Sequence, residues 1–262
     1  MRRAINGVTL GYDLEGAGTA VLFLHAFPLN RRMWAAQQEA LRGQARILAA
    51  DFRGFGETDL SPGPYSLEDL ADDVLGLARS LGVGRAVVVG LSMGGYVAFR
   101  LAARAPEFVQ ALVLADTRAE ADTPEGRTTR LDLAERVQRE GLAALEQFMQ
   151  GLVGPTTRTS RPEVTARLRQ IVDNPPPEAL AGALRALAYR PDSRPLLASI
   201  TVPTLVLVGE EDGLTTPESA RVIAGGIRGA RLVVLPQAGH LSNLETPEAF
   251  NRELVAFVRE LG

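Results

Sequence analysis

The chain contains no cysteine and no lysine among its 262 residues. The absence of cysteine excludes disulfides, thiol nucleophiles and thiolate metal ligands. Because all 28 basic residues are arginine, a lysine Schiff base, covalently attached pyridoxal phosphate and a P-loop lysine are excluded as well. Only two histidines are present, His25 and His240, too few for a zinc site with several histidine ligands. We therefore expect neither a metal nor a cofactor.

Long apolar runs and a strong net charge are also missing. No run approaches the roughly 18 apolar residues that a membrane-spanning helix needs. The net charge of −3 offers no field that would attract nucleic acid or acidic lipid. Met1-Arg2-Arg3 is not followed by the apolar stretch of a secretion signal. These absences predict a cytoplasmic protein with no nucleic-acid or membrane partner, and they are compatible with a homo-oligomer.

What the chain does contain is an alternation of short apolar runs and helical periodicity over residues 1–117 and 200–262. Apolar runs of the kind found in buried strands lie at residues 20–25, 46–51, 85–90, 109–115 and 202–208. Such alternation is typical of a mostly parallel sheet with helices on both faces. In addition, Asn6-Gly7 between two short strand-like runs predicts a β-hairpin.

Residues 118–199 break this alternation. They show helical periodicity over 131–140, 142–152, 164–172 and 177–189, with breaks at Gly154-Pro155 and at 174–177, and no convincing strand. We therefore predict a core domain made of residues 1–117 and 200–262, with residues 118–199 inserted as an all-helical cap.

Ser92 lies in the most informative motif of the chain. A run of valines leads into Gly90-Leu91-Ser92-Met93-Gly94, and a helix is predicted directly afterwards. This is the pattern of a nucleophile elbow, a sharp strand-to-helix turn that projects the serine hydroxyl from the sheet. A serine at a helix start is more commonly a simple N-cap. Here the flanking glycines and the preceding apolar strand favour a nucleophile.

A serine nucleophile needs a base and an acid. His240, in a loop after the last predicted strand, is the favoured base, whereas His25 is expected to brace a loop through hydrogen bonds. Asp212 follows the strand at 205–208 and precedes His240 by 28 residues, which gives the chain order Ser, Asp, His. Asp116, at another strand end, is the main alternative for the acid, and Glu211 is a third choice. Asp212 is also compatible with a plain turn residue.

Taken together, these motifs resemble those of the α/β-hydrolase fold superfamily. The resemblance covers nearly all of residues 1–117 and 200–262, and it includes the Asp51-Phe-Arg-Gly-Phe-Gly segment. It implies an α/β fold with a mostly parallel sheet of the eight-stranded type, helices on both faces, and an inserted helical cap. It also implies a catalytic triad of Ser92, Asp212 and His240 that works without a cofactor or metal.

The resemblance further assigns an oxyanion hole. His25-Ala26-Phe27-Pro28 stands where relatives usually have His-Gly and a variable residue. By this match, the backbone N–H groups of Phe27 and Met93 bind the oxyanion. Ala26 replaces the usual glycine, and a positive φ at this position would strain an alanine.

The function that the resemblance implies is hydrolysis of a small carboxylic ester or lactone through an acyl-enzyme. Within the superfamily, the resemblance is closest to esterases, 3-oxoadipate enol-lactonases and cofactor-free haloperoxidases or perhydrolases. The alternatives are a C–C bond hydrolase or a cofactor-free haloperoxidase or perhydrolase with the same triad, and after these a non-catalytic ligand receptor. A haloalkane dehalogenase would need an aspartate where Ser92 stands.

The predicted cap carries an apolar patch at Leu145, Phe148, Met149, Leu152 and Val153. If the patch faces the cleft, Phe148, Met149 and Leu152 contact an apolar part of the substrate. The alternative is that the patch only packs the cap helices against each other.

Overall fold

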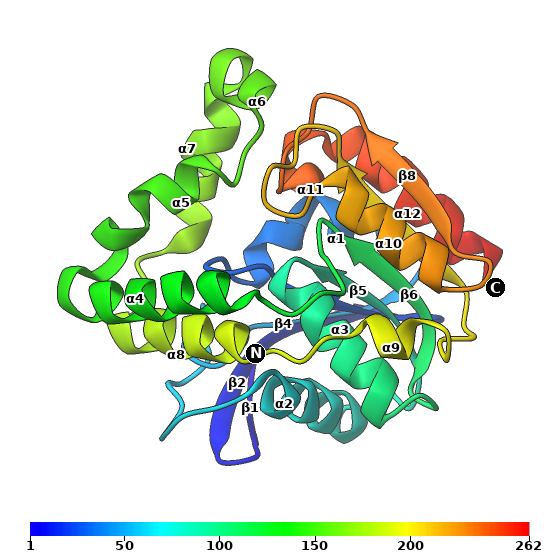
Figure 1. The fold of residues 1–262 in the computed structure, drawn as a ribbon. Coiled ribbons are helices and arrows are strands. Elements are labelled where there is room, and N and C mark those ends of the chain that lie inside the picture. The colour runs from blue at the N-terminus through cyan, green and yellow to red at the C-terminus, as the bar shows by residue number, and fades with distance from the viewer. Residues whose placement is uncertain (262) are drawn as a thin grey trace.

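The computed structural model describes residues 1–261 and is built on an eight-stranded sheet (Figure 1). The spatial order of the strands is β1-β2-β4-β3-β5-β6-β7-β8. β2 runs antiparallel to both of its neighbours, and the other pairs are parallel. The predicted α/β fold with a mostly parallel sheet is thus confirmed. The strands are β1 (Arg2–Ile5), β2 (Val8–Gly16), β3 (Ala20–Leu24), β4 (Arg46–Ala50), β5 (Ala86–Leu91), β6 (Val109–Ala115), β7 (Thr204–Gly209) and β8 (Arg231–Leu235).

The hairpin at the N-terminus has the predicted turn. Ile5 of β1 pairs with Val8 of β2, and two residues connect them. These residues, Asn6 and Gly7, have φ angles of 47° and 80°. A type I′ turn needs two positive φ angles, which asparagine and glycine adopt most readily.

Helices cover both faces of the sheet. α2 (Leu67–Ser80) and α3 (Met93–Arg104) pack against each other on one face, and α1 (Ala35–Leu41) and α12 (Pro247–Glu260) pack together on the other (Figure 1). A capping box formed by Ser66 and Asp69 starts α2. α1 is not among the sequence-based predictions, because Gln37 and Leu41 are its only buried residues and leave no apolar stripe to detect. The other helices outside the region between β6 and β7 are η1 (Arg31–Trp34), α10 (Pro217–Gly226) and α11 (Ser242–Glu245).

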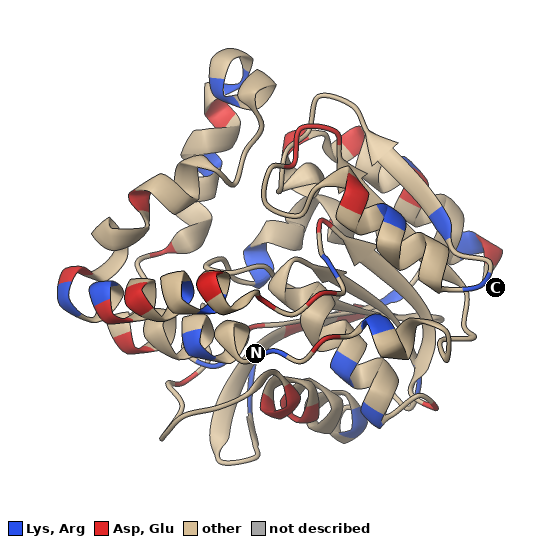
Figure 2. Cartoon of the chain, in the orientation of Figure 1, with Lys and Arg blue, Asp and Glu red and all other residues tan. Residues whose placement is uncertain are grey.

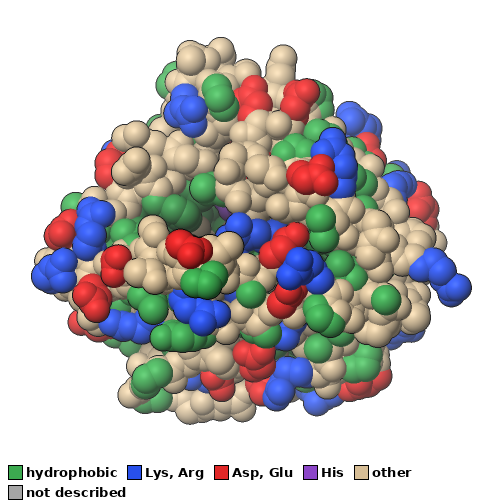
Figure 3. All heavy atoms as spheres, viewed as in Figure 1, with side chains coloured by type: hydrophobic (Ala, Val, Ile, Leu, Met, Phe, Trp, Pro, Cys, Tyr) green, Lys and Arg blue, Asp and Glu red, His purple; other side chains and the backbone are tan. Residues whose placement is uncertain are grey.

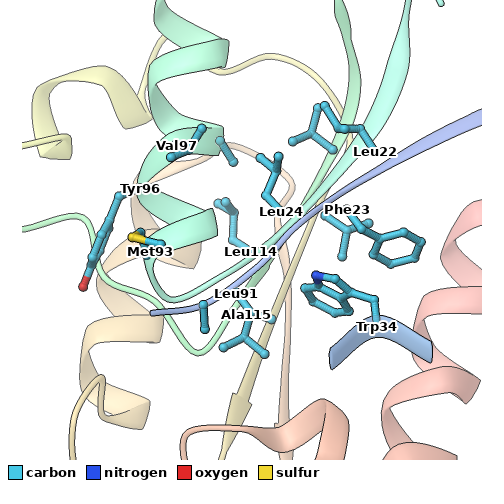
Figure 4. Packing of buried hydrophobic residues seen from close by; sticks show 14 of the residues in the cluster. Leu22, Phe23, Leu24, Trp34, Leu91, Met93, Tyr96, Val97, Leu114 and Ala115 are labelled. Carbon is cyan, nitrogen blue, oxygen red and sulfur yellow. The ribbon is translucent and has the colours of Figure 1, made fainter. Parts of the chain in front are cut away.

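The core is formed by strand side chains that alternate between the two faces of the sheet (Figure 4). Phe23 of β3 packs on Trp34 of η1, with ring centroids 5.0 Å apart. Its neighbour Leu24 points to the opposite face, where Met93 and Val97 of α3 lie. All five side chains are buried, and each buried side chain of this size contributes about 1.5–3 kcal/mol. This packing holds the ends of β3 and β5 and the start of α3 in place.

The region between β6 and β7 is helical. Residues 116–203, all of which the structure describes, contain no strand. We call residues 124–188 the helical segment; its helices α4 and α8 pack together, and α5, α6 and α7 extend beside the rest of the molecule (upper left in Figure 1). The helices of this region are α4 (Pro124–Glu140), η2 (Gly141–Leu145), α5 (Glu146–Gln150), α6 (Pro155–Ser160), α7 (Pro162–Val172), α8 (Pro177–Ala188) and α9 (Arg194–Leu197).

Besides small shifts at the start of α7 and the end of α8, three features of the helical segment differ from the sequence-based prediction. α4 begins at Pro124 rather than at 131, because the Thr123 side chain accepts a hydrogen bond from the Gly126 amide at 3.1 Å and caps a polar first turn. The helix predicted at 142–152 is divided into η2 and α5 and ends at Gln150. α6 is not predicted, since Thr157 is its one buried residue. Among residues 1–261, no helix has the length and apolar character needed to cross a bilayer.

Candidate active site

Ser92 occupies a strained turn between β5 and α3. Its backbone has φ 53° and ψ −112°, a region that non-glycine residues rarely adopt and that marks a functional constraint. A Cβ atom at Gly90 would overlap the Gly94 carbonyl, and one at Gly94 would overlap the Leu24 carbonyl. The two glycines of the motif therefore permit the close approach of strand and helix that a nucleophile elbow requires.

The Ser92 hydroxyl lies within hydrogen-bond distance of His240. The distance between Ser92 Oγ and His240 Nε2 is 2.9 Å, and that between His240 Nδ1 and Asp212 Oδ2 is also 2.9 Å. A neutral imidazole that donates from Nδ1 to the carboxylate leaves Nε2 free to accept the serine proton. The structure thus brings together the three residues that the sequence predicts as a triad, from the ends of β5 and β7 and the loop after β8.

Hydrogen bonds hold the Asp212 carboxylate in position. Oδ1 accepts from the amides of Leu214 and Thr215 at 2.8 and 2.9 Å, and Oδ2 accepts from the Thr215 hydroxyl at 2.7 Å. Burial alone would raise the pKa of Asp212, but the charge and hydrogen bond of His240 outweigh it and lower the pKa. Conversely, burial would lower the pKa of His240, whereas the Asp212 charge raises it above its usual value. Both shifts favour an ion pair when His240 takes up a proton.

The alternative acids point elsewhere. Asp116 is fully buried and accepts hydrogen bonds from the Gly209 amide at 2.8 Å and the Ser242 hydroxyl at 2.5 Å. Burial, together with the nearby charge of Asp212, raises its pKa well above the usual value and favours its neutral form. Glu211 accepts a hydrogen bond from the Thr156 amide at 2.9 Å. Geometry therefore selects Asp212 as the partner of His240.

His25 braces a loop, as the sequence predicts. Its Nε2 accepts a hydrogen bond from the Phe52 amide at 2.9 Å, and its Nδ1 lies 2.9 Å from the Ala26 carbonyl. Complete burial lowers its pKa. A ring whose two nitrogens are both engaged with backbone has no lone pair free to act as a base.

The amides assigned to the oxyanion hole are free of other partners. Within residues 1–261, neither Phe27 N–H nor Met93 N–H donates to any of the turn, loop or cap hydrogen bonds. Ala26 is not among the residues with positive φ. The strain considered for an alanine at this position is therefore absent, and the loop tolerates the replacement of glycine.

A cavity of about 80 Å³ lies over Ser92 and His240. Figure 3 shows the hollow on this side of the molecule, with hydrophobic side chains around it and histidine atoms at its depth. Of the predicted apolar contacts, Phe148 lines the cavity, whereas Met149 lines a separate hollow and Leu152 is fully buried. The structure thus brings only Phe148 to the triad. The full lining comprises Phe27, Ser92, Tyr96, Arg118, Arg130, Phe148, Leu187, Leu214, Thr215 and His240.

Sequence reasoning missed Glu245. This buried carboxylate accepts hydrogen bonds from the Gly239 and Leu241 amides at 2.9 and 3.2 Å, one on each side of His240. Its other oxygen accepts from the Gly154 amide at 2.8 Å and the Thr157 hydroxyl at 2.6 Å. Glu245 therefore fixes the His240 loop and ties it to the start of α6. Nothing in the local sequence, which resembles an ordinary helix start, signals this role.

Charged side chains are mixed in sign over the helical segment and around the sheet (Figure 2). Among residues 1–261, no cluster of three or more histidine, aspartate or glutamate side chains is arranged to hold a metal ion. The polar side chains that line the cavity are those of a serine, a histidine, a threonine, a tyrosine and two arginines.

The chain is similar in sequence and structure to known hydrolases. The family described as alpha/beta hydrolase fold matches residues 19–247. A thermophilic esterase from Thermogutta terrifontis, solved with malate bound, is 40% identical with a TM-score of 0.95, covering 100% of this chain and 99% of its own. The enol-lactonase from Burkholderia xenovorans is 34% identical with a TM-score of 0.91, covering 99% and 100%. 3-Oxoadipate enol-lactonase 2 of Acinetobacter baylyi is 29% identical, covering 98% of this chain and 93% of that protein.

Proposed function

Because the chain belongs to the alpha/beta hydrolase fold family, we propose that it is a serine hydrolase that cleaves small carboxylic esters or lactones. The observation that carries this proposal is the pair of 2.9 Å contacts that link Ser92 to His240 and His240 to Asp212. Its similarity to an esterase and to enol-lactonases supports an ester bond as the target.

In the proposed reaction, His240 Nε2 removes the hydroxyl proton as Ser92 Oγ attacks the carbonyl carbon. Asp212 stabilises the imidazolium that forms. The tetrahedral intermediate collapses as His240 gives its proton to the leaving alcohol, or to the ring oxygen of a lactone. Water, deprotonated by His240, then attacks the acyl carbon. The second tetrahedral intermediate collapses, His240 returns its proton to Ser92 Oγ, and the acid is released. Atoms and charge balance within the triad, without a cofactor.

We propose that the amides of Phe27 and Met93 bind the oxyanion of the tetrahedral intermediate. Both residues adjoin the site, since Phe27 lines the cavity and Met93 follows the nucleophile. A preorganised donor of this kind contributes about 3–4 kcal/mol to the stability of the transition state.

We also propose that residues 118–199 act as a cap on a core domain made of residues 1–117 and 200–262. The cavity supports this division, because Phe148 and Leu187 line it from the helical segment and Ser92 and His240 line it from the rest of the chain. A cavity of about 80 Å³ is smaller than the roughly 300–1,000 Å³ of typical ligand pockets. A small substrate is therefore expected.

The substrate proposal is tested by a panel of p-nitrophenyl esters from acetyl to decanoyl, together with a simple lactone. We expect hydrolysis of both classes, with kcat/KM falling roughly tenfold or more from the shortest to the longest acyl chain, because the cavity is small. A halide–peroxide mixture and a ring-cleavage diketone serve as comparison substrates. Turnover of either of these without turnover of esters or lactones would overturn the proposal.

The two histidines allow a direct test of the base. The Asp212 charge raises the pKa of His240 above its ordinary value, whereas burial lowers the pKa of His25. NMR titration should show two imidazoles, one with a pKa clearly higher than the other. Because the base must be neutral, kcat/KM should rise with pH through the higher of the two pKa values.

The substitution His240→Gln assigns the signals, since it should remove the imidazole with the higher pKa. Asp212→Asn should lower that pKa because it removes the carboxylate charge. If the activity instead follows the imidazole with the lower pKa, His240 is not the base.

A further inference from the structure

Two arginines line the cavity that contains Ser92. Arg118 follows β6, and Arg130 lies on α4. Both bond to Asp122: Arg118 Nη2 donates to it at 3.0 Å, and Arg130 Nε donates at 2.7 Å. Arg190 Nη2 also lies 2.7 Å from the Asp122 carboxylate. Basic side chains from two parts of the fold thus meet at one wall of the site.

Positive charge exceeds negative charge at this wall. Three guanidinium groups surround the single carboxylate of Asp122, so these four side chains carry two net positive charges. Burial alone would raise the pKa of Asp122, but the hydrogen bond from Arg130 and the charges of Arg130 and Arg190 outweigh it and lower the pKa to about 2. The carboxylate therefore stays ionised and holds the arginines in place without neutralising them all.

Several donors of the two cavity arginines have no protein acceptor. Arg118 Nε is buried and makes no hydrogen bond. Within residues 1–261, none of the hydrogen bonds involves Nη1 of Arg118 or Arg130. A guanidinium has five N–H donors in a planar fork that matches a carboxylate. Because both side chains line the cavity, an anion there can accept hydrogen bonds from their unpaired Nη1 groups.

Arg190 plays a different part from the other two. Its side chain is 2% exposed, and its guanidinium lies 4.6 Å from the ring centroid of Tyr96. It does not line the cavity, but Tyr96 does. Arg190 therefore supports the wall from behind, and Arg118 and Arg130 are the groups that a ligand can reach.

The remaining wall is apolar. Phe27, Phe148, Leu187 and Leu214 line the cavity beside the arginines. An apolar surface with two cations at one side suits a short hydrocarbon chain that ends in an anion. It is poorly suited to a ligand that is apolar throughout, because such a ligand would desolvate the arginines without pairing them.

We infer that the site selects esters or lactones that carry a free carboxylate, which Arg118 and Arg130 bind while the reacting carbonyl lies at Ser92. This inference rests on the proposed hydrolase function and narrows its substrate class to monoesters of short dicarboxylic acids and lactones with a carboxylate substituent. Arg118 and Arg130 are then specificity-determining residues.

Two substrates of equal size test the inference. One is the monomethyl ester of glutaric acid, and the other is the same ester with the free carboxylate replaced by a carboxamide. We expect kcat/KM to be about 10- to 100-fold higher for the anionic ester, the range expected for hydrogen bonds to a charged group. In Arg118→Gln and in Arg130→Gln this ratio should fall to near one.

Arg136→Gln is the matched control. Arg136 lies on α4, as Arg130 does, and pairs with Glu140 at the surface. The Arg136→Gln variant should keep the wild-type ratio of kcat/KM for the two esters. Arg130→Lys should give an intermediate ratio, since it keeps the charge but loses the planar fork. If Arg130→Gln does not fold, the wild-type ratio and Arg118→Gln still decide the question.

Protection from fluorophosphonate labelling separates this inference from the proposed function. Glutarate should slow the labelling of Ser92 in the wild type, and glutaramide should not. If the wild type is labelled and hydrolyses esters, but its kcat/KM values for the anionic ester and the carboxamide ester are nearly equal, the carboxylate subsite is overturned and the hydrolase proposal stands. A ratio unchanged in both arginine variants would also overturn it. Absence of labelling in folded protein would overturn the hydrolase proposal itself.

Discussion

Ser92→Ala should lower kcat for ester hydrolysis by on the order of 10⁶-fold, as expected when a triad nucleophile is removed. The residual rate comes from the oxyanion hole and substrate binding alone. Ser92 Oγ, 2.9 Å from His240 Nε2, is the nucleophile of the proposed reaction. A fluorophosphonate should label wild-type protein once, at Ser92, and mass spectrometry of the labelled peptide identifies the site.

Ser66 provides a matched control for Ser92, because it is a serine at a helix start that has only a capping role. The Ser66 side chain accepts a hydrogen bond from the Asp69 amide at 3.2 Å, whereas Ser92 makes no side-chain cap bond. Ser66→Ala should therefore lose about 1 kcal/mol of stability and keep full labelling. Ser92→Ala should lose labelling and hydrolysis while changing stability less. Labelling that persists in Ser92→Ala would show that another residue is the nucleophile.

Asp212→Asn should lower kcat by about 10⁴-fold. Asp212 Oδ2 lies 2.9 Å from His240 Nδ1, while Thr215 and the Leu214 amide hold the carboxylate in place. An amide in the same position can present an N–H group to Nδ1, which then carries no proton. The imidazole adopts the wrong tautomer, with Nε2 protonated and unable to accept the Ser92 proton.

Asp116→Asn is the control for the choice of acid. Asp116 is as deeply buried as Asp212, but its hydrogen bonds go to Gly209 and Ser242. Its raised pKa favours the neutral carboxyl, which an amide imitates in charge and size. Asp116→Asn should therefore cost far less in kcat than Asp212→Asn, measured with the same ester. If the two effects are reversed, Asp116 serves as the acid during the reaction.

Much of the fold could be predicted because its signals are local. The strands at 20–24, 86–91 and 204–209 are short apolar runs, and the turn at Asn6-Gly7 depends on the φ preferences of two adjacent residues. The sequence predicts that the helical segment is helical, but it does not place the ends of the individual helices correctly. α6 and the break between η2 and α5 depend on contacts that mostly polar residues make with the rest of the protein. Hydrophobic periodicity does not reveal such contacts.

The site was predictable only in part. Ser92, Asp212 and His240 could be proposed because strand ends of a parallel sheet meet at one edge and because only two histidines exist. Met149 and Leu152 were expected near a substrate, yet they lie away from the cavity, since an apolar stripe does not reveal which of its members faces a neighbour. Glu245 is missed because its hydrogen bonds to Gly154 and Thr157 span 91 and 88 residues. Arg118 is missed because its bond to the nearby Asp122 gives no sign that the side chain lines the cavity.

The sequence by itself determined which groups are available for chemistry: a serine in an elbow motif, two imidazoles, and no thiol or lysine. Tertiary structure alone decided which carboxylate serves His240 and which charges face the cavity. The physical reason is the range of the interactions. Turn and strand preferences act between neighbours in the chain, whereas Ser92 meets His240 across 148 residues and Glu245 meets the Gly154 amide across 91.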